Sequence, residues 1–186
     1  MTTLPLPKPR ELYFQKQVTQ DTIATLTNDI LSINKDDESL VREYGLYDIQ
    51  YMPKPIKLYI DSYGGSVYQG LGLIGVIGTS KTQIHTYVTG VAMSCGFMIA
   101  IHGSTRFAYR HSTFMYHQLS SATWGKMADM EQDVIESKRL QTLLQDLVSA
   151  KTAISQKTLQ DNYERKVDWY MTADQALVNG CVDIIL

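Results

Sequence analysis

The hydrophobic pattern alternates between short strand-like runs and longer helical stretches along the whole chain. Alternating or continuous apolar runs predict strands at 12–14, 56–60, 83–89, 106–109, 113–116 and 181–185. Helical periodicity and capping residues predict helices from Thr19 to about 34, then at 66–79, 91–102, 126–152 and 156–164, with another after Thr172. Because strands alternate with helices, the predicted fold class is α/β.

Two segments fall outside this alternation. Residues 1–10 contain three prolines and are interpreted as a flexible arm ahead of a single domain at 11–186. Residues 35–54 are polar and charged and contain Gly45 and Pro53, so they are predicted to form a loop or an inserted excursion.

The predicted helix at 126–152 has an apolar stripe along its length. The stripe consists of Met127, Met130, Val134, Ile135, Leu140, Leu143, Leu144, Leu147 and Val148. This is more apolar surface than one exposed helix face should carry in a monomer, which agrees with burial of part of it against a partner.

Composition narrows the class of protein. A chain of 186 residues with 44% hydrophobic residues fits one globular domain, and a net charge of -2 does not favour binding to nucleic acid or to an anionic membrane. The longest apolar stretches, 71–78 and 91–101, are shorter than the roughly 20 residues of a membrane span. Only two cysteines occur, which favours a reduced intracellular setting over a disulfide scaffold.

Acidic residues are missing from the centre of the chain. No Asp or Glu lies between Asp61 and Asp129. An interior segment explains this gap, but the gap also restricts the chemistry. Any carboxylate that serves a site in this region must come from Asp61 or from a position after 128.

Ser94 is the candidate nucleophile. It lies in Gly90-Val91-Ala92-Met93-Ser94-Cys95-Gly96, at the predicted start of an apolar helix that follows a strand. Small neighbours leave its hydroxyl accessible, and free N–H groups at a helix N-terminus suit a developing oxyanion. The alternative reading is a serine that only caps the helix.

Serine needs a base, and the chain has four histidines. His85 lies within a predicted strand and His102 at the end of a buried helix, so both are interpreted as structural. His111 lies in a polar turn. His117 follows the strand at 113–116, and the ends of strands are where α/β proteins build their sites, although a structural histidine remains the alternative.

The acid and the oxyanion donors are less constrained. Asp168 lies beside Trp169 and Tyr170, where aromatic cover could desolvate it in part, and composition favours it only slightly over Asp61. Gly64 and Gly65 offer backbone N–H groups without side-chain obstruction.

The spacing of Gly70, Gly72 and Gly75 also matches the sequence pattern of a dinucleotide-binding motif. That motif requires a tight turn directly after a strand. Here the glycines begin ten residues after the predicted strand and lie within a helix, and no acid follows at the required distance. We therefore reject a nucleotide cofactor.

Four blocks of the sequence resemble the proteolytic subunit of ATP-dependent Clp proteases, in family order over about 11–186. The blocks are Asp61-Ser62-Tyr63-Gly64-Gly65-Ser66-Val67, the Ser94 segment, Met115-Tyr116-His117-Gln118, and Asp168-Trp169-Tyr170-Met171-Thr172-Ala173 followed by Ala176, Gly180, Val182 and Asp183.

This resemblance implies a role for each site residue. It assigns Ser94, His117 and Asp168 to a catalytic triad, the N–H groups of Gly65 and Cys95 to the oxyanion hole, and Gly64, Ser66 and Val67 to substrate binding. It implies hydrolysis of unfolded proteins or peptides with no metal or cofactor in this chain.

The resemblance also implies an architecture and partners. The fold would be a spiral of ββα units shared with crotonases, with residues 119–152 as a protruding handle between stacked heptameric rings. An AAA+ unfoldase would be the partner that uses ATP. We expect a cytoplasmic location, or the equivalent organelle stroma or matrix.

Several departures leave alternatives open. Tyr63 stands where the family usually has proline, and Lys166-Val167 stands where it has an Asp-Arg pair used between rings. The alternatives are a non-catalytic ring or scaffold subunit of the same family and a crotonase-like acyl-CoA enzyme. A Ser-Lys signal-peptide peptidase is disfavoured because Lys81 and Lys126 lie in no matching motif.

Overall fold

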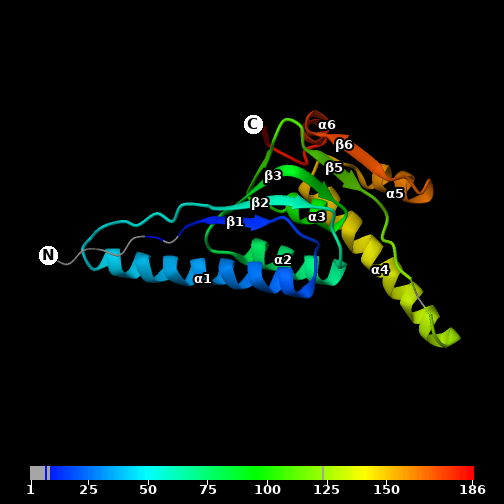
Figure 1. Ribbon diagram of the computed structural model, residues 1–186, viewed down its shortest axis with the longest axis horizontal. Coiled ribbons are helices and arrows are strands. Elements are labelled where there is room, and N and C mark those ends of the chain that lie inside the picture. Colours follow the sequence, from blue (N-terminus) through cyan, green and yellow to red (C-terminus); the bar gives the residue numbers. More distant parts are fainter. Residues whose placement is uncertain (1–6, 8, 123) are drawn as a thin grey trace.

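The computed structural model describes residues 7, 9–122 and 124–186 (Figure 1). In that part of the chain, helices alternate with strands as the hydrophobic pattern predicts, although some bounds differ from the prediction and one strand was not predicted. The helices are α1 (Gln20–Gly45), α2 (Val67–Thr79), α3 (Cys95–Ala100), α4 (Met127–Lys151), α5 (Gln156–Glu164) and α6 (Ala173–Val178). The strands are β1 (Glu11–Phe14), β2 (Ile56–Ser62), β3 (Ile84–Met93), β4 (Thr105–Ala108), β5 (Thr113–Tyr116), β6 (Trp169–Thr172) and β7 (Ile184–Ile185). The α/β class is confirmed.

The sheet is mostly parallel, with the order β1-β2-β3-β4-β7. Strand β3 is shared between two neighbours, because its first half pairs with β4 and its last residues, Val91–Met93, pair with β5. An irregularity in the register with β2 separates the two halves: Ile60 pairs with Val88 and Ser62 with Ala92. Strand β6 runs antiparallel to β5. Strand β3 bends at this irregularity, and its last residues therefore lie beside β5.

Helices α1 and α2 lie together along one face of the sheet, whereas α4 projects away from the body (Figure 1). The core between the sheet and these helices is almost wholly aliphatic and aromatic. Phe14, Leu58, Ile60, Leu73 and Phe97 are among its fully buried members. In the described part of the chain, no helix is both long and apolar enough to cross a membrane.

Helix α1 is longer than predicted, and the expected loop at 35–54 is wrong over its first part. The helix continues to Gly45. Its buried positions keep helical spacing: Ile23, Leu26, Ile30, Ile33, Asp37 and Leu40. The prediction ended the helix near residue 34 because the residues that follow are polar and charged, and the inward-facing Asp37 is one of them.

A buried ion pair explains why an aspartate occupies that inward position. Both oxygens of Asp37 accept hydrogen bonds from Arg10, and Thr82 Oγ1 donates to Asp37 Oδ2 at 2.5 Å. Burial raises the pKa of Asp37, but the hydrogen bonds from Arg10 and Thr82 outweigh it and hold the pKa below its usual range. Of the arm predicted at 1–10, residues 1–6 and 8 lie outside the described residues, and Arg10 is held against α1.

The predicted helix at 91–102 is also wrong at its start. Val91–Met93 form the end of β3, and α3 begins only at Cys95. An apolar run cannot by itself distinguish a buried strand from a buried helix, and here the pairing with β5 decides. Strand β6 was not predicted at all, and the predicted strand at 181–185 is reduced to Ile184–Ile185.

Candidate active site

Ser94 lies at the sharp turn between β3 and α3. Its backbone has φ 52° and ψ -124°, a left-handed conformation that is unusual for serine. Gly64 makes the turn possible, because a Cβ at Gly64 would lie 2.8 Å from the Cβ of Ser94. The N–H of Ser94 donates to Met115 O at 2.9 Å, which ties the turn to β5. Ser94 makes no side-chain capping bond to α3, so the capping alternative does not account for its hydroxyl.

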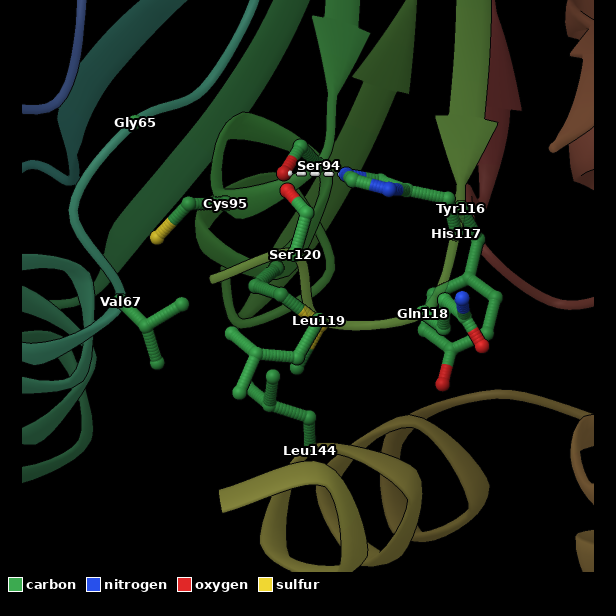
Figure 2. A pocket seen from close by; sticks show the side chains of 11 residues that line it. Gly65, Val67, Ser94, Cys95, Tyr116, His117, Gln118, Leu119, Ser120 and Leu144 are labelled. Carbon is green, nitrogen blue, oxygen red and sulfur yellow. Dashed lines mark hydrogen bonds between the residues drawn. The ribbon is translucent and has the colours of Figure 1, made fainter. Parts of the chain in front are cut away.

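The imidazole of His117 meets that hydroxyl. His117 directly follows β5, and its Nε2 lies 2.8 Å from Ser94 Oγ (Figure 2). Pairing of β3 with β5 places Met93 opposite Met115, so the residues that follow each strand emerge side by side. With Nε2 as acceptor, the imidazole is oriented to take a proton from the hydroxyl.

Asp168 is placed near His117 but is not bonded to it. Trp169 pairs with Tyr116 in the antiparallel β5–β6 ladder, so one step further Asp168 stands opposite His117. Asp168 is exposed, and among the described residues no hydrogen bond or ion pair joins its carboxylate to the imidazole. The structure thus brings Ser94 and His117 together and leaves Asp168 across the ladder.

The competing acid, Asp61, has a different partner. Its Oδ1 accepts the N–H of Val91 at 2.9 Å. A Cβ at Gly90 would lie 2.5 Å from the same oxygen, so glycine is required for this close approach. Asp61 therefore stabilises the bend in β3 rather than the imidazole.

The glycine turn after β2 forms one wall of the site. Gly64 and Gly65 have φ of 96° and 143°, conformations that favour glycine. Val18 fixes the turn, since its N–H donates to Gly64 O and its carbonyl accepts from Ser66 N–H. Among the described residues, the N–H groups of Gly65 and Cys95 have no hydrogen-bond acceptor. Both are available to a ligand in the pocket that these residues line.

The thiol of Cys95 points away from Ser94 (Figure 2). Its Sγ lies 3.5 Å from Ser66 O and packs against Gly70, where a Cβ would come within 2.0 Å. Burial raises the pKa of this thiol to about 11, so it remains protonated near neutral pH. Cys95 contributes its backbone to the site.

A small cavity of about 60 Å³ opens beside the hydroxyl. Its lining combines the predicted residues with apolar side chains: Gly65, Val67, Ser94, Cys95, Met98, Tyr116, His117, Gln118, Leu119, Ser120 and Leu144. Of the predicted substrate contacts, Val67 lines this cavity, whereas Gly64 packs beneath Ser94 and Ser66 is bonded to Val18. Met98, Leu119 and Leu144 were not predicted as site residues, because an apolar residue that lines a pocket resembles any core residue in sequence.

The remaining histidines lie elsewhere. His102 is buried, with Nδ1 2.6 Å from Met98 O, so Nδ1 carries the proton that this carbonyl accepts. Burial lowers its pKa. His85 packs against Phe107 within the sheet, and His111 is exposed in a turn.

Comparison with known proteins adds independent information. A model of the Clp protease family matches residues 6–186. The ATP-dependent Clp protease proteolytic subunit 1 of Prochlorococcus marinus subsp. pastoris is 30% identical over 95% of this chain and 83% of that protein. The corresponding subunit of Deinococcus radiodurans is 31% identical over 80% of this chain and 72% of its own length. Proteolytic subunit 2 of Treponema pallidum is 30% identical over 83% and 78%. The match of the family model to nearly the whole chain shows that this chain belongs to the Clp protease family.

Proposed function

We propose that this chain is a serine endopeptidase that cleaves unfolded proteins or peptides by acyl transfer. One observation carries the proposal: Ser94 Oγ, held on a strained turn, lies 2.8 Å from Nε2 of His117 at the mouth of a cavity. A hydroxyl paired with an imidazole is the arrangement that activates serine for attack on a carbonyl.

The reaction begins when a peptide carbonyl enters the cavity. Ser94 Oγ attacks the carbonyl carbon while His117 Nε2 takes the hydroxyl proton, and the carbonyl oxygen becomes an oxyanion. The N–H groups of Gly65 and Cys95 donate to this oxyanion. Collapse breaks the C–N bond, and His117 returns its proton to the leaving amine. Water then attacks the acyl carbon while His117 takes its proton. The bond between this carbon and Ser94 Oγ breaks, and His117 returns the proton to Ser94 Oγ.

Asp168 is proposed to orient the imidazole. In the tautomer that accepts from Ser94, His117 Nδ1 carries a proton and requires an acceptor. Trp169, the residue after Asp168, pairs with Tyr116, the residue before His117. In this proposal, rotation of the exposed Asp168 side chain brings an oxygen toward Nδ1. This carboxylate would then stabilise the imidazolium that forms during attack.

The cavity supports a preference for a peptide with an apolar side chain next to the scissile bond. Val67, Met98, Leu119 and Leu144 form its apolar wall. The lining residues include no Asp, Glu, Lys or Arg, so a charged substrate side chain would be desolvated there without a counter-charge.

Self-association supplies the chamber in this proposal. The exposed apolar residues Trp124, Met127, Met130, Val134 and Ile135, here named the handle face, lie along and just before the projecting half of α4. Burial of this surface against a second copy would remove it from water. The relatives are named as proteolytic subunits of ATP-dependent Clp proteases, which supports assembly with an ATP-using partner. We propose stacked heptameric rings and an AAA+ unfoldase as that assembly. The cytoplasmic or organellar location remains a prediction.

One observation favours a second candidate, a non-catalytic ring subunit. Asp168 makes no bond to His117 among the described residues, and an imidazole without its orienting acid is a weaker base.

Labelling with a fluorophosphonate separates the two candidates. The reagent forms a covalent adduct only with an activated serine, so wild-type protein should gain one adduct per chain by intact mass and should cleave an unstructured peptide. Ser94→Ala should lose both. As a control, Ser120→Ala alters another hydroxyl beside the cavity and should keep the adduct. A wild-type assembly that forms no adduct would identify the non-catalytic subunit.

A further inference from the structure

The segment that follows β5 carries His117 and is half-buried at 117–119 and exposed at 120–122. Residues 117–122 form no helix or strand. Leu119 lines two hollows, the cavity beside Ser94 and a second one of about 180 Å³ that is also lined by Val134, Ser137 and Tyr163. Because space remains in both hollows that Leu119 lines, side-chain packing alone does not fix this part of the backbone.

One buried side chain from α4 restrains this backbone. The N–H of Leu119 donates to Gln141 Oε1 at 2.7 Å, and Gln141 Nε2 lies 3.5 Å from the hydroxyl of Tyr116. Tyr116 immediately precedes His117, and Leu119 lies two residues beyond it. Gln141 therefore contacts the chain on both flanks of the imidazole, more closely at Leu119.

We propose that Gln141 is a positioning residue that holds the His117 segment, so that Nε2 stays within reach of Ser94 Oγ. The inference rests on the proposed peptidase activity. Gln141 is 6% exposed, so its amide hydrogen bond is shielded from competing water. The same cluster ties the projecting helix α4 to the active site, since Leu144 lies one turn further along α4 and lines the cavity (Figure 2).

The reaction rate should be sensitive to the hydrogen bond between Leu119 N–H and Gln141, because the position of His117 depends on it. The base must lie within about 2.6–3.2 Å of the proton that it abstracts. A displacement of about 1 Å at the reacting groups can cost about a hundredfold in rate. Loss of the Leu119 restraint would let His117 sample positions outside that range without altering any group that takes part in the chemistry.

The test compares three variants of the full, assembled chain. Gln141→Met keeps the length of the side chain but removes the acceptor, and it should slow fluorophosphonate reaction at Ser94 by about tenfold or more. Gln141→Glu keeps an acceptor for Leu119 N–H and should retain most of the wild-type rate. Gln145→Met is the matched control, because Gln145 is equally buried one turn further along α4 and its Nε2 has no partner among the described residues. This control should react at the wild-type rate.

A readout besides reactivity is the hydrogen exchange of the Leu119 amide. The amide should be protected in wild type and in Gln141→Glu, and it should exchange rapidly in Gln141→Met. Rapid exchange in wild type would overturn the inference, even if Gln141→Met does not fold. So would a Gln141→Met reaction rate equal to that of Gln145→Met. If wild-type protein forms no adduct at all, the proposed peptidase function fails, and the exchange measurement still decides whether Gln141 holds the segment.

Discussion

Ser94 adopts a left-handed backbone conformation that costs a residue other than glycine about 1–3 kcal/mol. Hydrogen bonds and close backbone contacts in the surrounding turn hold Ser94 in this conformation. Ser94 N–H donates to Met115 O, Gly64 lies against the Ser94 side chain, and Gly96 approaches Ser62 O so closely that a Cβ would lie 2.8 Å away. This arrangement holds the hydroxyl clear of α3 and toward His117.

Replacement of Asp168 by asparagine tests the orienting role at the scale of one residue. Asp168→Asn removes the charge that would stabilise imidazolium and offers Nδ1–H a weaker acceptor. We expect kcat for peptide cleavage to fall by between about tenfold and 10⁴-fold, the loss seen in an aligned triad. Asp174→Asn, a change at a nearby exposed aspartate, is the control. An unchanged kcat in Asp168→Asn would contradict the role.

We expect the buried His102 to make the free energy of unfolding decrease in acid. Burial lowers the pKa of His102, the hydrogen bond to Met98 O opposes this, and the charges of Lys151 and Arg106 add to the lowering. Between the unfolded pKa near 6.5 and the lower folded pKa, the unfolded chain therefore binds more protons. The contribution of His102 to the free energy of unfolding should be fully present above about pH 6.5. It should decrease as the pH falls from about 6.5 toward the lower folded pKa.

The variant His102→Asn isolates this effect. Asparagine can donate to Met98 O but does not titrate, so the melting temperature of the variant should depend less steeply on pH below about 6.5. His85, whose pKa is also lowered by burial, accounts for part of what remains. Parallel pH profiles for wild type and His102→Asn would contradict the assignment.

Helix α2 contains two glycines, Gly70 and Gly72, that differ in the space around a Cβ built at each. At Gly70 a Cβ would meet Cys95 Sγ at 2.0 Å, whereas at Gly72 nothing lies within 4 Å of a built Cβ. Gly70→Ala should therefore lower the free energy of unfolding by about 1–3 kcal/mol through overpacking. It should also reduce activity, because Cys95 adjoins Ser94. Gly72→Ala should raise the free energy of unfolding by up to about 1 kcal/mol. Denaturant unfolding of the two variants checks this, and equal losses in both would contradict it.

The elements that could be predicted from sequence are those with a clear period. Helices α4 and α5 and strands β4 and β5 lie within a residue or two of their predicted bounds, because apolar spacing and turn residues marked both ends. Helix α1 was predicted to end near residue 34, ahead of Asp37, whose burial depends on Arg10 and Thr82 from distant parts of the chain. No local pattern reports such a long-range ion pair.

The errors near the site have the same origin. Val91–Met93 became a strand because β5 lies beside them, and Trp169–Thr172 became β6 because the other edge of β5 was free for pairing. The motifs identified Ser94 and His117 as candidates, but their separation of 2.8 Å follows from strand pairing. The sequence did not identify Gln141 as a site residue, since a glutamine in a long amphipathic helix is expected to lie on the surface.

At the scale of the whole molecule, the handle face is an exposed apolar surface that the single chain does not cover. Trp124 is 86% exposed and Met127 is 78% exposed. If this surface packs against a second copy, a charge placed there should break the contact. We therefore expect Ile135→Asp to lower the native mass of the assembly, because a buried carboxylate without a partner is costly.

The control for this change is Gln132→Asp, which adds the same charge at an exposed polar position of the same helix. The subunit fold should survive in both variants, since Ile135 lies outside the core. An Ile135→Asp assembly with unchanged mass would contradict a role of the handle face in self-association.

In the proposed function, the hydroxyl of Ser94 is a nucleophile activated by the imidazole of His117. The most direct measurement is peptide mapping by mass spectrometry of the assembly after reaction with a fluorophosphonate. A single adduct on Ser94 that is strongly reduced in His117→Gln is the predicted result. An adduct at another residue, or one on Ser94 that forms equally fast in His117→Gln, would contradict the account.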